Sequence, residues 1–229
     1  MVLQKQTLLE GLRSLPGDER LLRSIAELLE REKQWKELQQ IILEQLPSLP
    51  RGSALEAHAC YLGGKASLEL GDLRPALGLI SRAVQLQGDQ WYSQHILGRV
   101  LARLGRSAEA LLAQQRCGEL APGFTWAWFE IGQLQLALGN MQAAREALER
   151  ALRLQEVQNP GQCHLFQQAL ADVKARARQA EREEASRGLW PERQPPPAGE
   201  RLPALEELML SLEQFRLFLD RYESRSRPG

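Results

Sequence analysis

Apolar and polar residues alternate at helical spacing on both sides of a single glycine, Gly139, near the middle of the chain. The apolar positions on its two sides lie three or four residues apart: Ile131, Leu134, Leu138, Ala144, Leu148 and Ala151. Such spacing places the side chains on one face of an α-helix. Gly139 falls where the first helix would end, in the left-handed conformation that a residue without a Cβ adopts at little cost. The pattern therefore predicts two helices joined by a tight turn.

The same pattern returns along the chain, because Gly71, Gly105 and Gly139 are each separated by 34 residues. Three further columns of small residues keep this step: Gly64, Gly98 and Gly132; Ala76, Ala110 and Ala144; Ala83, Cys117 and Ala151. Small residues in fixed columns let helices approach closely. One helix pair cannot bury its apolar face alone, so stacked units must complete the core. We expect three units, 57–90, 91–124 and 125–158.

These units resemble the tetratricopeptide repeat (TPR) family, most closely in WFEIGQLQLALGNMQAAREALERAL, Trp128 to Leu152. The resemblance implies an all-α, right-handed superhelical solenoid of antiparallel helix pairs. Basic charge carried by Arg more than Lys indicates a GC-rich genome. We expect a bacterial protein that resembles this family. The chain departs from the family pattern at Ser67, Leu101 and Gln135, where an aromatic residue is usual. Gln114 replaces a large apolar residue, and the closing proline is kept only as Pro122.

The regions that flank the three units also read as helical. In residues 1–56 the apolar pattern predicts an N-terminal helix that ends at Pro16 and Gly17. A degenerate unit from Arg20 to Leu46 is expected to follow it. Residues 159–188 predict a capping helix that starts at Asn159 and Pro160. Its apolar stripe comprises Phe166, Leu170, Val173, Ala177 and Ala180. Residues 189–203 are expected to be a proline-rich linker, and residues 204–224 are predicted to form an amphipathic C-terminal helix.

Charge and motifs narrow the function. Twenty-nine basic residues balance 29 acidic ones, so no net field attracts nucleic acid. Three cysteines without CxxC spacing fit reduced thiols, and no run is long enough to span a membrane. The sequence contains no phosphate-binding loop, no nucleophile elbow and no Cys or His residues at the spacing of a metal site. The sequence predicts a cytoplasmic, non-catalytic protein without cofactor or metal, and Cys117 is expected to be a core filler.

What remains is a binding surface. In the family that the units resemble, the first helix of each unit lines a concave groove, and certain positions on it commonly meet ligand. Those positions give this predicted peptide-binding set: Tyr61, Lys65, Tyr92, His95, Arg99, Arg103, Trp126, Phe129 and Gln133. They predict an aromatic and basic groove, and hence an acidic, apolar peptide. The alternatives are that Trp126 and Phe129 pack against Phe166 and that the basic residues form a solvated face.

The C-terminal segment 204–222 supplies a candidate ligand from the same chain, because it places glutamates beside a leucine stripe. We expect it to dock on the solenoid or on another copy of the chain, favoured by its tether. The function predicted is a protein interaction scaffold, gated by this segment. Two alternatives stay open: an accessory or regulatory module of a bacterial enzyme such as a transferase, and an RNA-binding helical repeat that uses Arg99 and Arg103.

Overall fold

A computed structural model describes residues 2–186 of the chain. Residues up to Arg178 form one compact unit. The described residues contain ten α-helices and two short 3-10 helices, and no strand. Their bounds are α1 Val2–Ser14, α2 Glu19–Arg31, α3 Trp35–Gln45, η1 Leu46–Ser48, α4 Ala54–Leu70, α5 Leu73–Leu86, α6 Trp91–Arg103, α7 Ser107–Leu120, α8 Thr125–Ala137, α9 Met141–Gln158, η2 Pro160–Gln162 and α10 His164–Ser186. The predicted linker 189–203 and C-terminal helix 204–224 lie outside the described residues.

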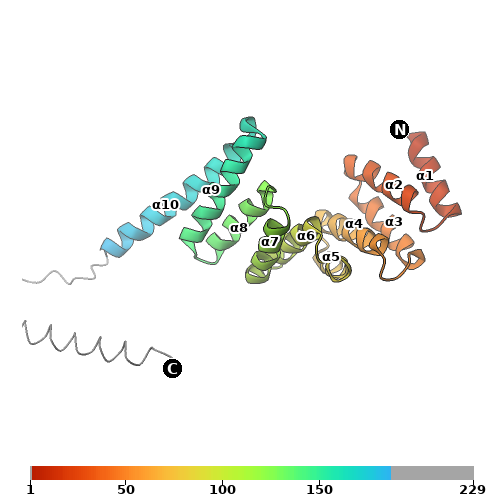
Figure 1. The fold of residues 1–229 in the computed structure, drawn as a ribbon, viewed down its shortest axis with the longest axis horizontal. Coiled ribbons are helices and arrows are strands. Elements are labelled where there is room, and N and C mark those ends of the chain that lie inside the picture. Colours follow the sequence, from red (N-terminus) through yellow and green to blue (C-terminus); the bar gives the residue numbers. More distant parts are fainter. Residues whose placement is uncertain (1, 187–229) are drawn as a thin grey trace, which may run out of the picture. The chain divides into compact units, whose positions relative to one another are not determined.

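Consecutive helices pack on one another from α1 to α9 (Figure 1). The all-α class and the stack of helix pairs are therefore confirmed. The pairs α4/α5, α6/α7 and α8/α9 carry the three sets of 34 residues. Helices α6 and α8 begin at Trp91 and Thr125, where the second and third units were predicted to start. Helix α4 begins at Ala54, three residues before the predicted start of the first unit.

The turn inside each pair is closed by the predicted glycine. Gly71, Gly105 and Gly139 have φ angles of 87°, 77° and 83°. At Gly139 the glycine N–H donates to Leu136 O over 3.1 Å, and the next N–H donates to Gln135 O over 2.9 Å. These are the two bonds of a Schellman cap, which satisfies carbonyls at the end of the first helix. The prediction of a left-handed glycine turn is confirmed.

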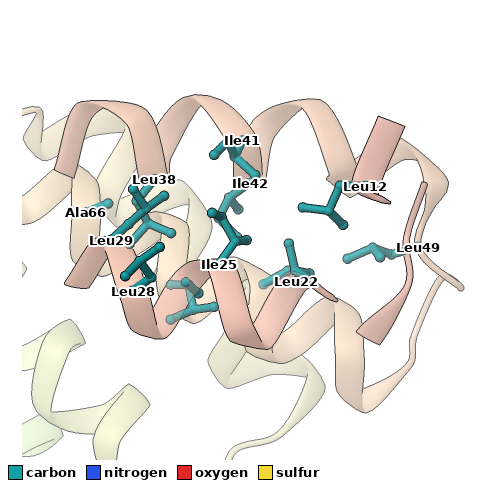
Figure 2. Close-up of a cluster of buried hydrophobic side chains, with 13 residues drawn as sticks. Leu12, Leu22, Ile25, Leu28, Leu29, Leu38, Ile41, Ile42, Leu49 and Ala66 are labelled. Atoms are coloured by element: carbon teal, nitrogen blue, oxygen red, sulfur yellow. The ribbon is translucent and has the colours of Figure 1, made fainter. Parts of the chain in front are cut away.

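The N-terminal helices α1–α3 pack around large aliphatic side chains (Figure 2). Leu22, Ile25 and Leu29 of α2 are fully buried against Leu38 and Ile42 of α3. This pair ends its first helix without glycine: Lys33 takes the left-handed φ of 55° instead. The core of this part therefore rests on bulky residues, whereas the later pairs rely on small ones for close approach.

The capping helix differs from the prediction in its start and in the length of its apolar stripe. Instead of an α-helix from Asn159 and Pro160, the chain makes the 3-10 turn η2, and α10 begins only at His164. Gly161 inside that turn has low helix propensity. Phe166, Leu170 and Val173 are buried as predicted, and the latter two pack on Ala144 and Leu148 of α9. Ala180 is exposed, so the apolar stripe is shorter than predicted.

Candidate functional site

The predicted binding residues all lie on the first helices of the three pairs. Tyr61 and Lys65 are on α4, four residues from Tyr92 to Arg103 are on α6, and Trp126, Phe129 and Gln133 are on α8. Gln133 is exposed, and Tyr61, Tyr92, His95 and Phe129 are partly buried. We call these nine residues the groove residues, after the prediction that selected them.

Aromatic rings connect the first helices. Tyr61 of α4 meets Tyr92 of α6 edge-on, with ring centroids 4.6 Å apart. Trp91 lies 4.6 Å from Phe124, and His95 lies 4.9 Å from the same ring. Sequence reasoning missed Trp91 and Phe124, although both are aromatic residues at the borders of the 34-residue units. Burial raises the pKa of both tyrosine phenols, so these rings act as neutral, apolar surfaces.

A second aromatic group joins α8 to the capping helix. The ring centroid of Phe166 on α10 lies 5.4 Å from that of Trp126 and 5.2 Å from that of Phe129. The packing alternative therefore describes the contacts of both α8 residues. Trp126 nevertheless keeps 44% of its surface exposed. Its exposed face is available to another molecule.

The three cations of the predicted groove each have a partner within the chain. Lys65 pairs with Glu30 over 3.0 Å, and Arg99 pairs with Glu69 over 3.3 Å. The guanidinium of Arg103 donates to the Leu68 carbonyl over 2.8 Å. In both ion pairs the carboxylate comes from the first helix of the preceding helix pair. The charges of Lys65 and Arg99 are therefore compensated by carboxylates, whereas Arg103 is exposed and bonds only a neutral carbonyl.

A buried amide, Gln114 of α7, organises a polar cluster between α6 and α8. Its side chain is fully buried. Its Nε2 donates to the His95 carbonyl over 3.1 Å and to Glu130 Oε2, and His95 Nδ1 lies 3.2 Å from its Oε1. Arg99 Nε lies 3.7 Å from Glu130 Oε1. We call His95, Arg99, Gln114 and Glu130 the Gln114 cluster.

Three of the four residues of the Gln114 cluster stand at positions that are apolar in the neighbouring units. At the step of 34 residues, Gln114 corresponds to Ile80 and Leu148, both fully buried. In the same way, Glu130 corresponds to Leu62 and Ile96, and His95 to Tyr61 and Phe129. Three polar residues thus replace three apolar ones at a single junction. Buried polar groups cost stability unless they are hydrogen-bonded, so such a concentration marks this junction as a functional candidate.

Burial brings both titratable groups at the centre of this cluster towards their neutral forms. It raises the pKa of Glu130 to about 7, against the influence of Arg99 and the Gln114 hydrogen bond. It lowers the pKa of His95 to about 4, although the hydrogen bond with Gln114 works in the other direction. The pKa of the Glu130 carboxyl therefore lies above that of the His95 imidazole, the reverse of the usual order, because burial disfavours the charged form of either group.

The cysteines do not resemble nucleophiles. Cys60 and Cys117 are buried, and burial raises their thiol pKa values to about 11 and about 12. Within residues 2–186, no group of three or more His, Cys, Asp or Glu side chains is placed to hold a metal ion. No helix in this range is both long enough and apolar enough to cross a membrane.

The fold and this site define a class: stacked helix pairs with a surface of aromatic and polar side chains on their first helices. Residues 127–158 match the model of the tetratricopeptide repeat. No curated protein matches the chain. The match covers the third unit, where sequence reasoning found the strongest resemblance.

Solved structures share this fold. The chain is similar to MamA, with a TM-score of 0.60 and 20% identity, over 67% of this chain and 88% of that one. It is similar to YrrB, a TPR protein with an unusual peptide-binding site, with a TM-score of 0.58 and 21% identity, over 74% and 81% of the two chains. The TPR2B domain of yeast Sti1, solved in complex with pHsp70, gives a TM-score of 0.50 at 20% identity, over 52% and 97%. The fold is that of TPR proteins, which typically serve as protein interaction scaffolds.

Proposed function

We propose that this protein binds a peptide or helix of another protein on the first-helix face formed by the groove residues, and that it does so without catalysing a reaction. The observation that carries this proposal is the partly exposed aromatic surface, above all Trp126. Aromatic side chains that are held by neighbours and open on one face are typical centres of binding energy. The similar folds of YrrB, which has a peptide-binding site, and of the TPR2B domain of yeast Sti1, solved in complex with pHsp70, give the proposal further support.

The bound segment is expected to be apolar rather than acidic. An acidic peptide would have to compete with Glu30 and Glu69, which already pair with Lys65 and Arg99. Apolar side chains would instead meet the rings of Tyr61, Tyr92 and Trp126. The RNA-binding alternative loses support for the same reason, since Arg99 is held between carboxylates rather than presented to phosphate.

Display of random twelve-residue peptides on phage, selected on the full chain, tests this function. Selected peptides should bind the wild-type chain, and Trp126→Ala should weaken binding by at least about tenfold, as expected for a buried aromatic anchor. Leu112→Ala is the matched control, because Leu112 is 66% exposed but belongs to α7, a second helix. If no peptide is enriched, or if both substitutions have the same effect, the proposed binding face is wrong.

Segment 204–222 is the candidate occupant that the chain itself carries, and it lies outside the described residues. We propose that it competes with partners for the groove residues. Leu208→Ser with Leu212→Ser in the full chain removes part of its leucine stripe. Selected peptides should then bind more tightly than to the wild type, because the internal competitor is weakened. Unchanged peptide affinity would contradict gating, while leaving the binding face itself in place.

A further inference from the structure

Glu130 has one oxygen that the fold fixes and one that it leaves open to a closer donor. Its Oε2 accepts a hydrogen bond from the buried amide of Gln114. Its Oε1 has Arg99 Nε at 3.7 Å, beyond the 2.7–3.2 Å of a good N–H···O bond. The side chain is 25% exposed. Glu130 is therefore oriented by the core and still accessible from outside.

The charge around Glu130 leaves room for a second cation. Arg99 pairs with Glu69 over 3.3 Å and faces Glu130 at the longer distance, so one guanidinium serves two carboxylates. The next cation along α6, Arg103, donates to the Leu68 carbonyl. His95 from α6, at 4.0 Å, does not supply the missing charge, since burial lowers its pKa to about 4. When Glu130 is deprotonated, it therefore shares the positive charge of Arg99 with Glu69.

Trp126 provides an apolar surface one helical turn before Glu130 on α8. Trp126 and Glu130 are four residues apart on α8, and such residues are neighbours on a helix surface. The indole is 44% exposed and is held from behind by Phe129 and Phe166. A guanidinium or ammonium on a flexible alkyl stem can lie over an aromatic ring and reach a carboxylate beside it.

We propose that Trp126 and Glu130 form a subsite for a cationic side chain, arginine or lysine, of the peptide bound at the groove residues. This inference rests on the proposed function and adds the chemical identity of one anchor. Glu130 accepts the charged head at Oε1, and Gln114 is the positioning residue that holds the other oxygen. The partner is thus an apolar segment with one basic side chain, in contrast to the acidic ligand that the sequence predicts.

The peptides selected on the full chain test the subsite. Those that bind the wild type should share one Arg or Lys at a fixed position. Selection on Glu130→Lys should remove that preference and favour Asp or Glu there. If peptides bind and depend on Trp126 but show no basic position, the cation subsite is refuted while the binding function stands. If no peptide binds at all, the proposed function fails and the subsite fails with it.

A double-mutant cycle then isolates the contact between the two charges. Replacing the basic residue of a selected peptide by Gln should weaken binding to the wild type about tenfold, as for a partly desolvated charge pair. The same replacement should change binding to Glu130→Gln less than about twofold. Glu119→Gln is the control, because Glu119 is an exposed carboxylate of α7 paired with Arg116. Equal losses in the wild type and in Glu130→Gln would overturn the proposal.

Proton release gives a readout that a purely structural role of Glu130 would not change. The groups facing its carboxyl are Arg99 and His95 from α6, and Gln114 and Cys117 from α7. Because its pKa is raised to about 7, a cation that binds at pH 7 should displace about half a proton per peptide. Calorimetry in buffers of different ionisation enthalpy measures this release. It should vanish in Glu130→Gln, and its persistence there would contradict the subsite.

Discussion

Residues 80, 114 and 148 occupy the same place on the second helix of three successive units, and all three side chains are fully buried. Two are aliphatic, Ile80 and Leu148, and one is the amide Gln114. Each packs against the glycine of its own first helix. A Cβ added at Gly98 would lie 2.6 Å from Gln114 Nε2, and one added at Gly132 would lie 2.6 Å from Leu148 Cγ. The same close approach therefore accommodates either kind of side chain.

The difference between these junctions lies in what the buried side chain requires from its neighbours. Leu148 packs among Ala144, Leu170 and Val173, which make no demand on geometry beyond filling space. Gln114 needs His95 and Glu130 as hydrogen-bond partners. An aliphatic junction can thus change one residue at a time, whereas the polar junction changes only as a set. Stability alone does not explain the polar set, since well-packed apolar residues often do as well.

Moving the amide to an aliphatic junction should produce the largest effect. Leu148→Gln would bury a carboxamide among alanine, leucine and valine side chains. The lost aliphatic packing and the unsatisfied amide should together lower the free energy of unfolding by about 3–5 kcal/mol. Urea denaturation followed by circular dichroism measures this change. Leu112→Gln, at an exposed position of α7, should change the stability by less than about 0.5 kcal/mol.

The reverse exchange should show that the polar junction behaves as a set. Gln114→Leu alone removes a donor from Glu130 and from the His95 carbonyl, and should destabilise the chain by about 1–3 kcal/mol. Gln114→Leu with Glu130→Ile restores the aliphatic residues of the neighbouring units. We expect the double variant to be at least as stable as the wild type, with a coupling free energy of about 1–3 kcal/mol.

Denaturation of the wild type, both single variants and the double variant completes this cycle. Additive effects of the two substitutions would contradict the view that Gln114 and Glu130 depend on each other. A double variant that is stable but has lost peptide binding would locate the role of the cluster in recognition.

Much of the fold could be predicted because it depends on local chemistry repeated at a fixed step. A glycine such as Gly139 ends a helix through its own backbone conformation. The same residue type at Gly105 and Gly71 predicts the turns of the other helix pairs. The start of the capping helix was missed, because Asn159 and Pro160 are as compatible with a 3-10 turn as with an α-helix. The N-terminal pair was predicted as a degenerate unit from Arg20 to Leu46, although Lys33 and not glycine stands at its turn.

The site was predicted less completely, because its contacts join residues of different units. Glu69 and Arg99 are 30 residues apart and Glu30 and Lys65 are 35 residues apart, so their pairing depends on how neighbouring first helices are stacked. The comparison of equivalent positions in the units therefore identifies the cations but not the carboxylates that pair with them. A usable signal for the Gln114 cluster was present, since His95, Gln114 and Glu130 each break an apolar column. In the sequence Gln114 is a local departure from the pattern, and only the packing of α6, α7 and α8 brings the three residues together.

The smallest expected effect is on the pH dependence of stability, to which Glu130 and His95 of the polar junction contribute with opposite signs. Glu130 has its pKa raised from 4.5 to about 7, so the folded chain holds a proton that the unfolded chain releases, and stability falls as pH rises from 4.5 to 7. His95 has its pKa lowered from 6.5 to about 4, so the unfolded chain binds the extra proton, and stability falls as pH drops from 6.5 to 4. Between pH 4.5 and 6.5 the two contributions oppose each other.

Single substitutions should uncover the two opposite slopes. Glu130→Gln leaves the His95 contribution, so the free energy of unfolding should rise with pH by about 1 kcal/mol per unit between 4.5 and 6.5. His95→Phe, which introduces the residue found at Phe129, leaves the Glu130 contribution and should give a slope of similar size and opposite sign. The comparison is always with the wild type, whose other groups titrate alike in all three proteins. Two variants with the same slope would contradict the opposite pKa shifts of Glu130 and His95. Opposite slopes would establish that the proton resides on Glu130 while His95 stays neutral, which is the state in which an incoming cation exchanges with it.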